Sequence, residues 1–189
     1  MAARAGMVNA IRELRLLMDA NQQNVNVNGV MYWTDEQVQI ILDDTSHDII
    51  DVLLESTPFH VAGTLTYVRY YIPDIVPRWI EEGAAVVVVD NLGNTAPSFT
   101  YDRTRRLIEF AVDTTGTQYF LRGRGFNMNE SAAAGWLRKA SVRAELIKWK
   151  TPAHTLDEDQ EYQHCLDMYR QYQNKLGLVS SPVRRTGYV

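Results

Sequence analysis

The middle of the chain, residues 48–121, constrains the fold most strongly. It is rich in Val, Ile, Thr and Tyr and is interrupted at intervals by proline or glycine. Such residues fit a pleated, half-buried surface, and the interruptions mark turns between strands. The clearest hairpin is FTYDRTRRLIEF, in which a polar turn from Asp102 to Arg105 separates two apolar runs. The pattern predicts an antiparallel β-meander with strands over residues 49–55, 63–72, 85–89, 98–101, 107–112 and 117–122.

Helical periodicity precedes this β region. Apolar residues recur every three or four positions over residues 8–18, which predicts a first helix. A capping-box pattern at Thr34 predicts a second helix that starts there and ends near residues 44–46. The polar, asparagine-rich segment over residues 21–28 is predicted to be a loop.

Two longer helices are predicted after the β region. A central helix is expected over residues 127–148, with Asn127 as its N-cap. Small residues dominate its apolar face, which allows a neighbouring helix to pack closely. The residues expected to anchor this helix in the core are Ala133, Trp136, Leu137, Ala140, Ala144 and Ile147. A final helix is expected over residues 155–177, after which residues 178–189 are predicted to form an extended arm.

These elements predict the α+β fold class. The expected arrangement is a helical core of N-terminal, central and C-terminal helices, with an inserted antiparallel β-meander over residues 48–122 and the extended C-terminal arm. One domain is expected over residues 1–177, because no internal repeat or long linker divides the chain.

Composition narrows the classes of function. A formal charge of −4 does not suit a protein that grips DNA with a broad basic face. The single cysteine, Cys165, cannot form an internal disulfide, which favours a reducing compartment such as a bacterial cytoplasm. The first residues lack the apolar core of a signal peptide, and the longest uncharged apolar run, residues 83–89, is too short to span a bilayer. No membrane partner is therefore expected.

Few residues suggest catalysis or metal binding. His47 and Asp51 are four apart and would share a helix face as metal ligands, but no second pair accompanies them. His164 and Cys165 are adjacent, so on a helix they point about 100° apart, and Cys165 is expected in the core. We expect no catalytic residue, metal or cofactor. A small hydrolase or metal enzyme is an alternative, with His47, His60 and His164 as the histidines to test.

Other polar groups have plainer interpretations. The RGRG of residues 122–125 lacks a phosphate-binding spacing, and its glycines are predicted to turn the strand sharply into the helix. The arginines of residues 103–106 lie on a hairpin turn and are expected to be surface charges. The acidic groups at residues 43–44, 81–82 and 157–159 are expected on solvated faces or at helix starts.

One stretch carries a family resemblance. Residues 117–149, TQYFLRGRGFNMNESAAAGWLRKASVRAELIKW, resemble the core of head-tail connector (portal adaptor) proteins of tailed bacteriophages. The shared features are a strand ending in an aromatic residue and leucine, a glycine step, an Asn cap, an alanine triplet, a tryptophan and a Lys-Ala pair. In such proteins this strand runs into a central helix, and a later helix of the form LDEDQEYQHCLDMYRQYQNKLG packs beside it. The long segment over residues 52–97 has no residue-by-residue match.

The resemblance implies a structural virion protein rather than an enzyme. Such an adaptor forms a homo-oligomeric ring beneath the portal, twelve-fold to match it, extends the DNA channel and provides the platform for neck or tail attachment. The implied partners are the portal protein, the next neck or tail-completion protein, other copies of the chain, and double-stranded DNA that passes without sequence-specific binding. The implied location is the virion neck, with assembly in the bacterial host cytoplasm.

Residues 178–189 are a candidate docking segment, because they contain two arginines and no acidic residue. The residues expected to dock on the portal or a neighbouring subunit are Leu178, Val179, Pro182, Val183, Arg184, Arg185 and Tyr188. A frayed terminus is the alternative. One alternative for the whole chain is another phage neck or tail ring protein, such as a head-completion or tail-terminator protein. Another is a regulatory DNA-binding protein, but the excess of acidic residues argues against it.

Overall fold

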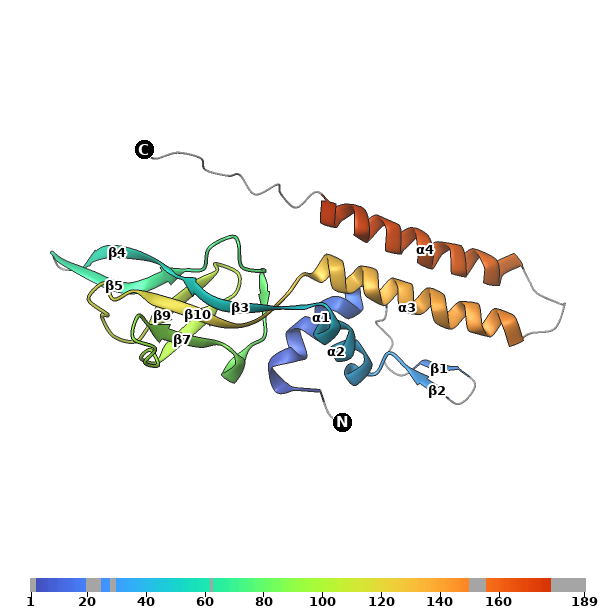
Figure 1. Cartoon of the computed structure of the whole chain (residues 1–189), viewed down its shortest axis with the longest axis horizontal. Coiled ribbons are helices and arrows are strands. Elements are labelled where there is room, and N and C mark those ends of the chain that lie inside the picture. The colour runs from blue at the N-terminus through green and yellow to red at the C-terminus, as the bar shows by residue number, and fades with distance from the viewer. Residues whose placement is uncertain (1–2, 20–24, 28–29, 62, 150–155, 178–189) are drawn as a thin grey trace. The chain divides into compact units, whose positions relative to one another are not determined.

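The computed structural model describes residues 3–19, 25–27, 30–61, 63–149 and 156–177. Within these residues the chain is α+β, with four α-helices and two four-stranded antiparallel sheets besides a short hairpin (Figure 1). The contacts divide the chain into two compact units. The first holds residues 1–12 and 35–127, and the second holds residues 13–34 and 128–189. The expectation of one domain over residues 1–177 stays a prediction.

Strand β10 (Tyr119–Phe126) is the centre of one sheet in the first unit. Strand β3 (Ser46–Leu53) pairs along one side of it, and β6 (Trp79–Ile80) and β7 (Val87–Asp90) pair along the other. The second sheet has the order β4-β5-β9-β8. Its strands are β4 (Glu55–Val61), β5 (Thr64–Tyr71), β9 (Leu107–Phe110) and β8 (Phe99–Asp102).

The core of the first unit draws on both sheets. Ile49, Val88 and Leu121 from the first sheet belong to the same buried cluster as Tyr70 and Ile108 from the second. The Tyr70 hydroxyl donates to the Thr117 carbonyl at 2.8 Å, so its polar end is satisfied inside this apolar cluster. Burial raises the pKa of Tyr70, which keeps the phenol protonated.

Three short helices complete the first unit. They are η1 (Ala5–Met7), α2 (Asp35–Asp44) and η2 (Gly83–Ala85), and helix α1 (Val8–Leu17) follows η1 directly. In α2, Val38, Ile41 and Leu42 are buried on one face, as their three- and four-residue spacing predicts.

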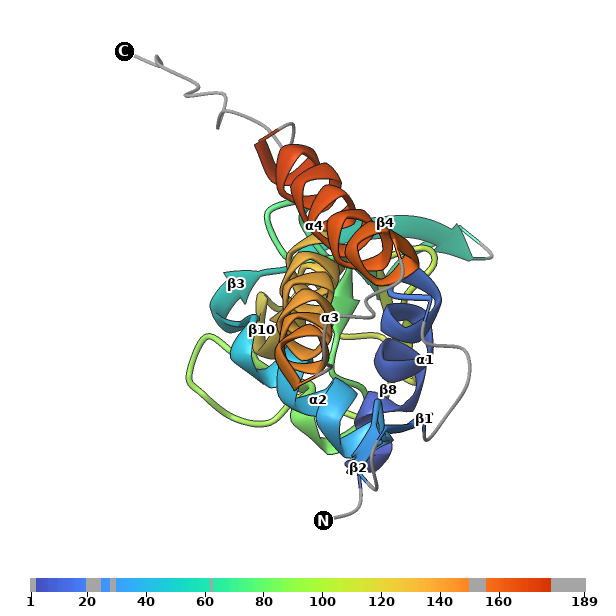
Figure 2. The same ribbon diagram turned by 90° about the vertical axis from the view of Figure 1, so that its right-hand side faces the viewer.

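Two long helices form most of the second unit. Helices α3 (Met128–Trp149) and α4 (Leu156–Gly177) pack side by side (Figure 2), and β1 (Val25–Val27) pairs with β2 (Val30–Tyr32). Trp136 of α3 is 3% exposed, and its Nε1 donates to the Leu17 carbonyl at 3.0 Å. The Tyr172 hydroxyl of α4 donates to the same carbonyl at 3.3 Å. None of the described helices is both long and apolar enough to cross a bilayer.

The four predicted helices and the hairpin formed by β8 and β9 are confirmed. Several strand predictions are corrected. The run predicted over residues 49–55 is divided between two strands at Leu54, and β4 continues through Pro58, where a break was expected. Strands β6, β1 and β2 were not predicted, and part of the predicted loop over residues 21–28 is β1. The strand order is not that of a sequential meander, because β10 pairs with strands distant in sequence.

The glycines of the RGRG segment have a different role from the one predicted. Gly123 and Gly125 lie inside β10 rather than at a turn. A Cβ on Gly123 would be 3.0 Å from the Ala85 carbonyl oxygen, and one on Gly125 would be 2.9 Å from the Pro77 ring. These positions therefore let neighbouring backbone approach the strand closely.

Candidate functional site

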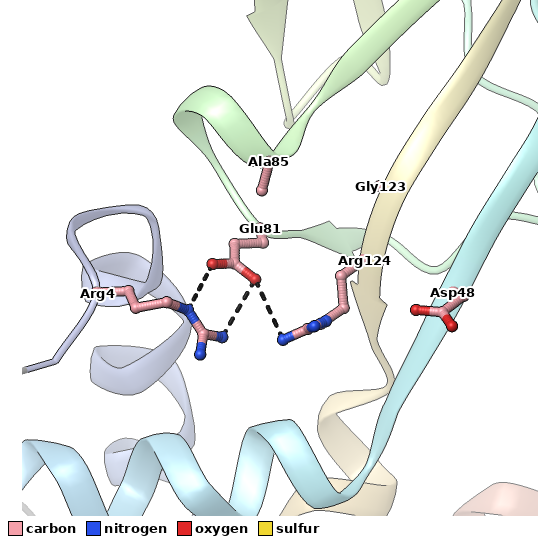
Figure 3. Close-up of a pocket in the computed structure, with 6 residues that line it drawn as sticks. All are labelled: Arg4, Asp48, Glu81, Ala85, Gly123 and Arg124. Atoms are coloured by element: carbon pink, nitrogen blue, oxygen red, sulfur yellow. Dashed lines mark hydrogen bonds and ion pairs between the residues drawn. The ribbon is translucent and has the colours of Figure 1, made fainter.

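Arginine and carboxylate side chains from separate elements of the first unit meet in one cluster (Figure 3). Arg4 precedes η1, Asp43 lies in the last turn of α2, Glu81 follows β6, and Arg124 lies on β10. The Arg4 guanidinium donates from Nε to Glu81 Oε1 at 2.8 Å. It also donates from Nη1 and Nη2 to the two oxygens of Asp43, at 2.9 and 2.6 Å. One guanidinium thus bridges two carboxylates, and it binds Asp43 through two parallel hydrogen bonds.

Arg124 approaches the same carboxylates from the sheet. Its Nη1 lies 3.3 Å from Asp43 Oδ1 and 3.9 Å from Glu81 Oε2. Beside the cluster lies a hollow of about 370 Å³. Its lining residues are Arg4, Asp48, Glu81, Ala85, Gly123 and Arg124. The hollow therefore has a polar wall in which arginines and carboxylates alternate.

The electrostatics of the cluster favour its charged state. Burial alone would raise the pKa of Asp43, but hydrogen bonds and charge attraction from Arg4 outweigh burial and lower it. The hydrogen bonds that Arg4 donates to Asp43 and Glu81 raise the pKa of Arg4. Both changes move the pKa away from neutrality, so neither group suits proton transfer at neutral pH. The arrangement suits holding separate segments together.

Backbone contacts fasten the start of the chain at the same place. The Arg4 amide donates to Gln39 Oε1 at 2.7 Å, and the Glu82 amide donates to the Gly6 carbonyl at 3.1 Å. Asn9 Nδ2 donates to the Glu82 carboxylate at 3.0 Å. Gly6 lies so close to the Glu82 backbone that a Cβ there would clash. The first turn of the chain is thereby held against α2 and the residues after β6.

His47 and Asp51, which were considered as metal ligands on one helix face, do not share a helix. His47 and Asp51 lie on strand β3 rather than on a helix. Four residues along a strand span about 13 Å, because each residue rises about 3.3 Å. Asp51 instead pairs with Arg122 at 2.6 Å. Among the described residues, no three His, Cys, Asp or Glu side chains are grouped as metal ligands.

The remaining histidine and cysteine candidates lie apart from the arginine cluster in sequence. His60 is exposed on β4. His164 packs edge-to-face on Trp136, with 5.5 Å between ring centroids, and Cys165 beside it in sequence is buried. Burial raises the pKa of the Cys165 thiol, which keeps it protonated and weakens it as a nucleophile.

Lys139 was not predicted as a notable residue. Its Nζ lies 4.4 Å from the centroid of the Trp136 ring and 5.8 Å from that of Trp33, and it donates to the Met18 carbonyl. Burial lowers the pKa of Lys139. Cation-π contact with two rings and a carbonyl acceptor compensates for that burial and ties α3 to the end of the α1 segment within the second unit.

The predicted core anchor of α3 is found in part. Ala133, Trp136 and Ala140 are buried, and Ala144 is half-buried. Leu137 is 44% exposed, so its assignment to the core is corrected. Around the helix it lies about 40° from Ala133, on the side away from Trp136, so the buried face extends from Ala133 and Ala140 toward Trp136. The Ile147 side chain and the predicted docking segment, residues 178–189, lie outside the described residues.

The hairpin arginines also need correction. Arg106 is not a free surface charge, because its Nη2 donates to the carbonyls of Pro73 and Val76, the latter at 2.9 Å. Arg103 lies over the Trp79 ring at 3.9 Å from its centroid. Arg105 alone of the three is exposed. Likewise, Asp43 and Glu81 belong to the arginine cluster rather than to solvated faces, while the side chains of residues 157–159 lie outside the described residues.

Comparison with protein families, with curated proteins and with solved structures found no match to this chain.

Proposed function

We propose that this protein is a head-tail connector, or portal adaptor, of a tailed bacteriophage. The observation that carries the proposal is the continuity of β10 with α3, separated only by Asn127, together with the packing of α4 beside α3. The resemblance of residues 117–149 to connector proteins implies this same succession. In this proposal the helices form the helical core and the sheets of the first unit are the inserted β region.

The proposed role is structural. Copies of the chain form a ring, twelve-fold to match the portal, that continues the DNA channel and presents a platform to the next neck or tail component. The formal charge of −4 supports a channel role, because each additional phosphate contact would retain DNA in a salt-dependent manner. The arginines of the cluster are engaged with carboxylates, so they do not add to a phosphate-binding surface.

The proposal also assigns the C-terminal segment, residues 178–189, to docking on the portal or a neighbouring subunit. Arg184 and Arg185 would supply charged donors, and the apolar residues around them would supply burial.

The test uses purified chain and two preparations of phage heads, one with a portal and one without. The full chain is expected to sediment with portal-bearing heads and not with heads that lack a portal. A chain that lacks residues 178–189 is expected to bind at least ten-fold more weakly. Equal binding to both preparations would contradict the connector function. Equal binding of the full and shortened chains would contradict the docking role of the segment.

A further inference from the structure

The hollow beside the arginine cluster contains two opposite charges that face each other across neighbouring strands without pairing. Asp48 on β3 and Arg124 on β10 are register partners in an antiparallel pair, so their side chains extend on the same face of the sheet. Opposite charges at such positions attract each other. Arg124 instead directs its Nη1 to Asp43 and Glu81, at 3.3 and 3.9 Å. The space between Asp48 and Arg124 therefore belongs to the hollow.

Each of these two side chains keeps hydrogen-bonding groups that the described protein does not use. Among the residues that the structure describes, the Asp48 carboxylate has no hydrogen bond or ion pair, and Nε and Nη2 of Arg124 donate no hydrogen bond. Figure 3 shows both side chains at the hollow, with no hydrogen bond or ion pair between them. The Nε and Nη2 atoms form an edge of the guanidinium that can bind a carboxylate through two parallel hydrogen bonds. The hollow thus presents an acceptor beside a pair of donors.

The charges around the hollow disfavour a ligand that carries only one sign of charge. Two arginines, Arg4 and Arg124, and three carboxylates, those of Asp43, Asp48 and Glu81, leave a net charge of −1. An anion at Arg124 would lie beside the Asp48 carboxylate, and a cation at Asp48 would lie beside the Arg124 guanidinium. Like charges repel at such distances, and the same argument excludes a nucleic-acid phosphate. A small ligand with both charges would meet the opposite charge at each end.

The dimensions and support of the hollow suit a small molecule. Its volume of about 370 Å³ falls at the lower end of the range for ligand pockets, which runs from about 300 to 1,000 Å³. Arg124 lies on β10, the central strand of its sheet, and Asp48 lies on the strand paired with it, so both backbones are held in place. Preformed groups of this kind lose little conformational freedom when a ligand binds.

We propose that this hollow binds a free α-amino acid. The ligand carboxylate accepts hydrogen bonds from Nε and Nη2 of Arg124, and the ligand ammonium donates to the Asp48 carboxylate. An α-amino acid carries these two charges on adjacent carbon atoms, so one small molecule bridges two register partners that do not pair with each other. This site goes beyond the proposed connector function and does not depend on it.

The other lining residues indicate which amino acids the site would prefer. Ala85 and Gly123 are small, and Arg4 and Glu81 are engaged with each other at 2.8 Å. A second charge on the ligand would therefore find no unengaged partner among these four lining residues. We expect a small neutral side chain, such as that of alanine or serine, to be preferred over a charged one.

Titration of the full chain with three small probes tests the ligand class. L-alanine carries both charges, L-lactate has a hydroxyl in place of the ammonium, and ethylamine lacks the carboxylate. L-alanine is expected to give saturable shifts of amide NMR signals in β3 and β10, and each of the other probes should bind at least ten-fold more weakly. Absence of saturable shifts with L-alanine would overturn the site. Equal affinity for L-lactate or ethylamine would overturn the assignment to an amino acid.

A charge-removing substitution locates the site on the chain. Asp48→Asn is expected to weaken L-alanine binding at least ten-fold, because the neutral amide no longer attracts the ammonium. Asp48 is exposed, and urea denaturation checks that this variant is as stable as the original chain. Asp74→Asn, at a fully exposed carboxylate outside the hollow, is the matched control and should bind L-alanine as the original chain does. Equal affinities of the two variants would overturn the proposal.

Discussion

At the scale of the residue, Arg4 holds the arginine cluster together, since its guanidinium donates to both Asp43 and Glu81. Arg4→Ala is expected to lower the free energy of unfolding by about 1 to 3 kcal/mol. That range lies between the free-energy cost of breaking a buried ion pair and the small stabilisation that an exposed ion pair provides. Urea denaturation followed by circular dichroism measures the loss.

The matched control for Arg4→Ala is Arg105→Ala, whose side chain lies 3.7 Å from Asp102 and is largely exposed. It is expected to cost less than about 0.5 kcal/mol. Equal losses of unfolding free energy in the two variants would show that the arginine cluster adds no more stability than a surface ion pair.

The carboxylate of Asp43 should give the first unit part of its acid sensitivity. The pKa of Asp43 is lower in the folded chain than its ordinary value of 3.8, so the unfolded chain binds the proton more readily. The stabilisation is present at neutral pH and is lost as the pH falls below about 4. Urea denaturation between pH 7 and pH 3 should show a shallower decline for Asp43→Asn than for the original chain.

The double variant with Arg4→Ala provides the control for that pH series. Once Arg4 is absent, the main cause of the lowered pKa is absent too, so adding Asp43→Asn should change the pH dependence little. Parallel pH profiles for the original chain and Asp43→Asn would contradict the assignment.

Single-residue roles were the least predictable from sequence. Arg4 lies in a short segment, AARAG, with no pattern that indicates its partners, which are 39 and 77 residues away along the chain. Arg106 shows the same limit: as one of several arginines on a hairpin turn it was expected in solvent, yet it binds backbone carbonyls of a distant loop. Partners of this kind depend on tertiary packing rather than on local spacing.

At the scale of the element, β10 depends on close approach at its glycines. Gly125→Ala is expected to cost about 1 to 3 kcal/mol of unfolding free energy, because the new methyl group would meet the rigid Pro77 ring. Thermal and urea denaturation measure the loss. Pro77→Ala in the same chain should restore part of it, and a double-mutant cycle separates that coupling from each single effect. If the losses of unfolding free energy from Gly125→Ala and Pro77→Ala simply add in the double variant, the predicted contact between these two positions is contradicted.

Helix α3 offers a comparison between adjacent positions. Trp136→Ala is expected to cost about 3 to 5 kcal/mol, since the ring is buried and its Nε1 is bonded to the Leu17 carbonyl. Leu137→Ala should cost less than about 1 kcal/mol, because Leu137 is exposed. Urea denaturation compares the two. A cost below 1 kcal/mol for Trp136→Ala would contradict the packing of this helix.

Elements were predicted unevenly. The helices were found because apolar spacing and capping residues are local signals, as in α2, where Val38, Ile41 and Leu42 follow the pattern and are buried. Strand pairing was not predicted, because the periodicity of one strand does not identify the strand that pairs with it. Nothing in the local sequence indicates that β10 lies between β3 and β7. Pro58 was taken as a break because proline lacks a backbone donor, but it lies on the edge strand β4, where that donor is not required.

At the scale of the whole molecule, the proposed function is assembly. The arginine cluster and the buried aromatic core hold the first unit, and the paired long helices hold the second. The proposed ring subunit in the neck of a phage rests on the resemblance of residues 117–149.

The most direct test of the connector function is the mass of the purified portal protein mixed with an excess of this chain, measured by light scattering after size-exclusion chromatography. Each bound copy adds 21.6 kDa, so the number of copies per portal follows from the mass gained. We expect a defined complex with one copy of the chain for each portal subunit. A portal that elutes with its own mass alone, with the chain eluting separately, would contradict it.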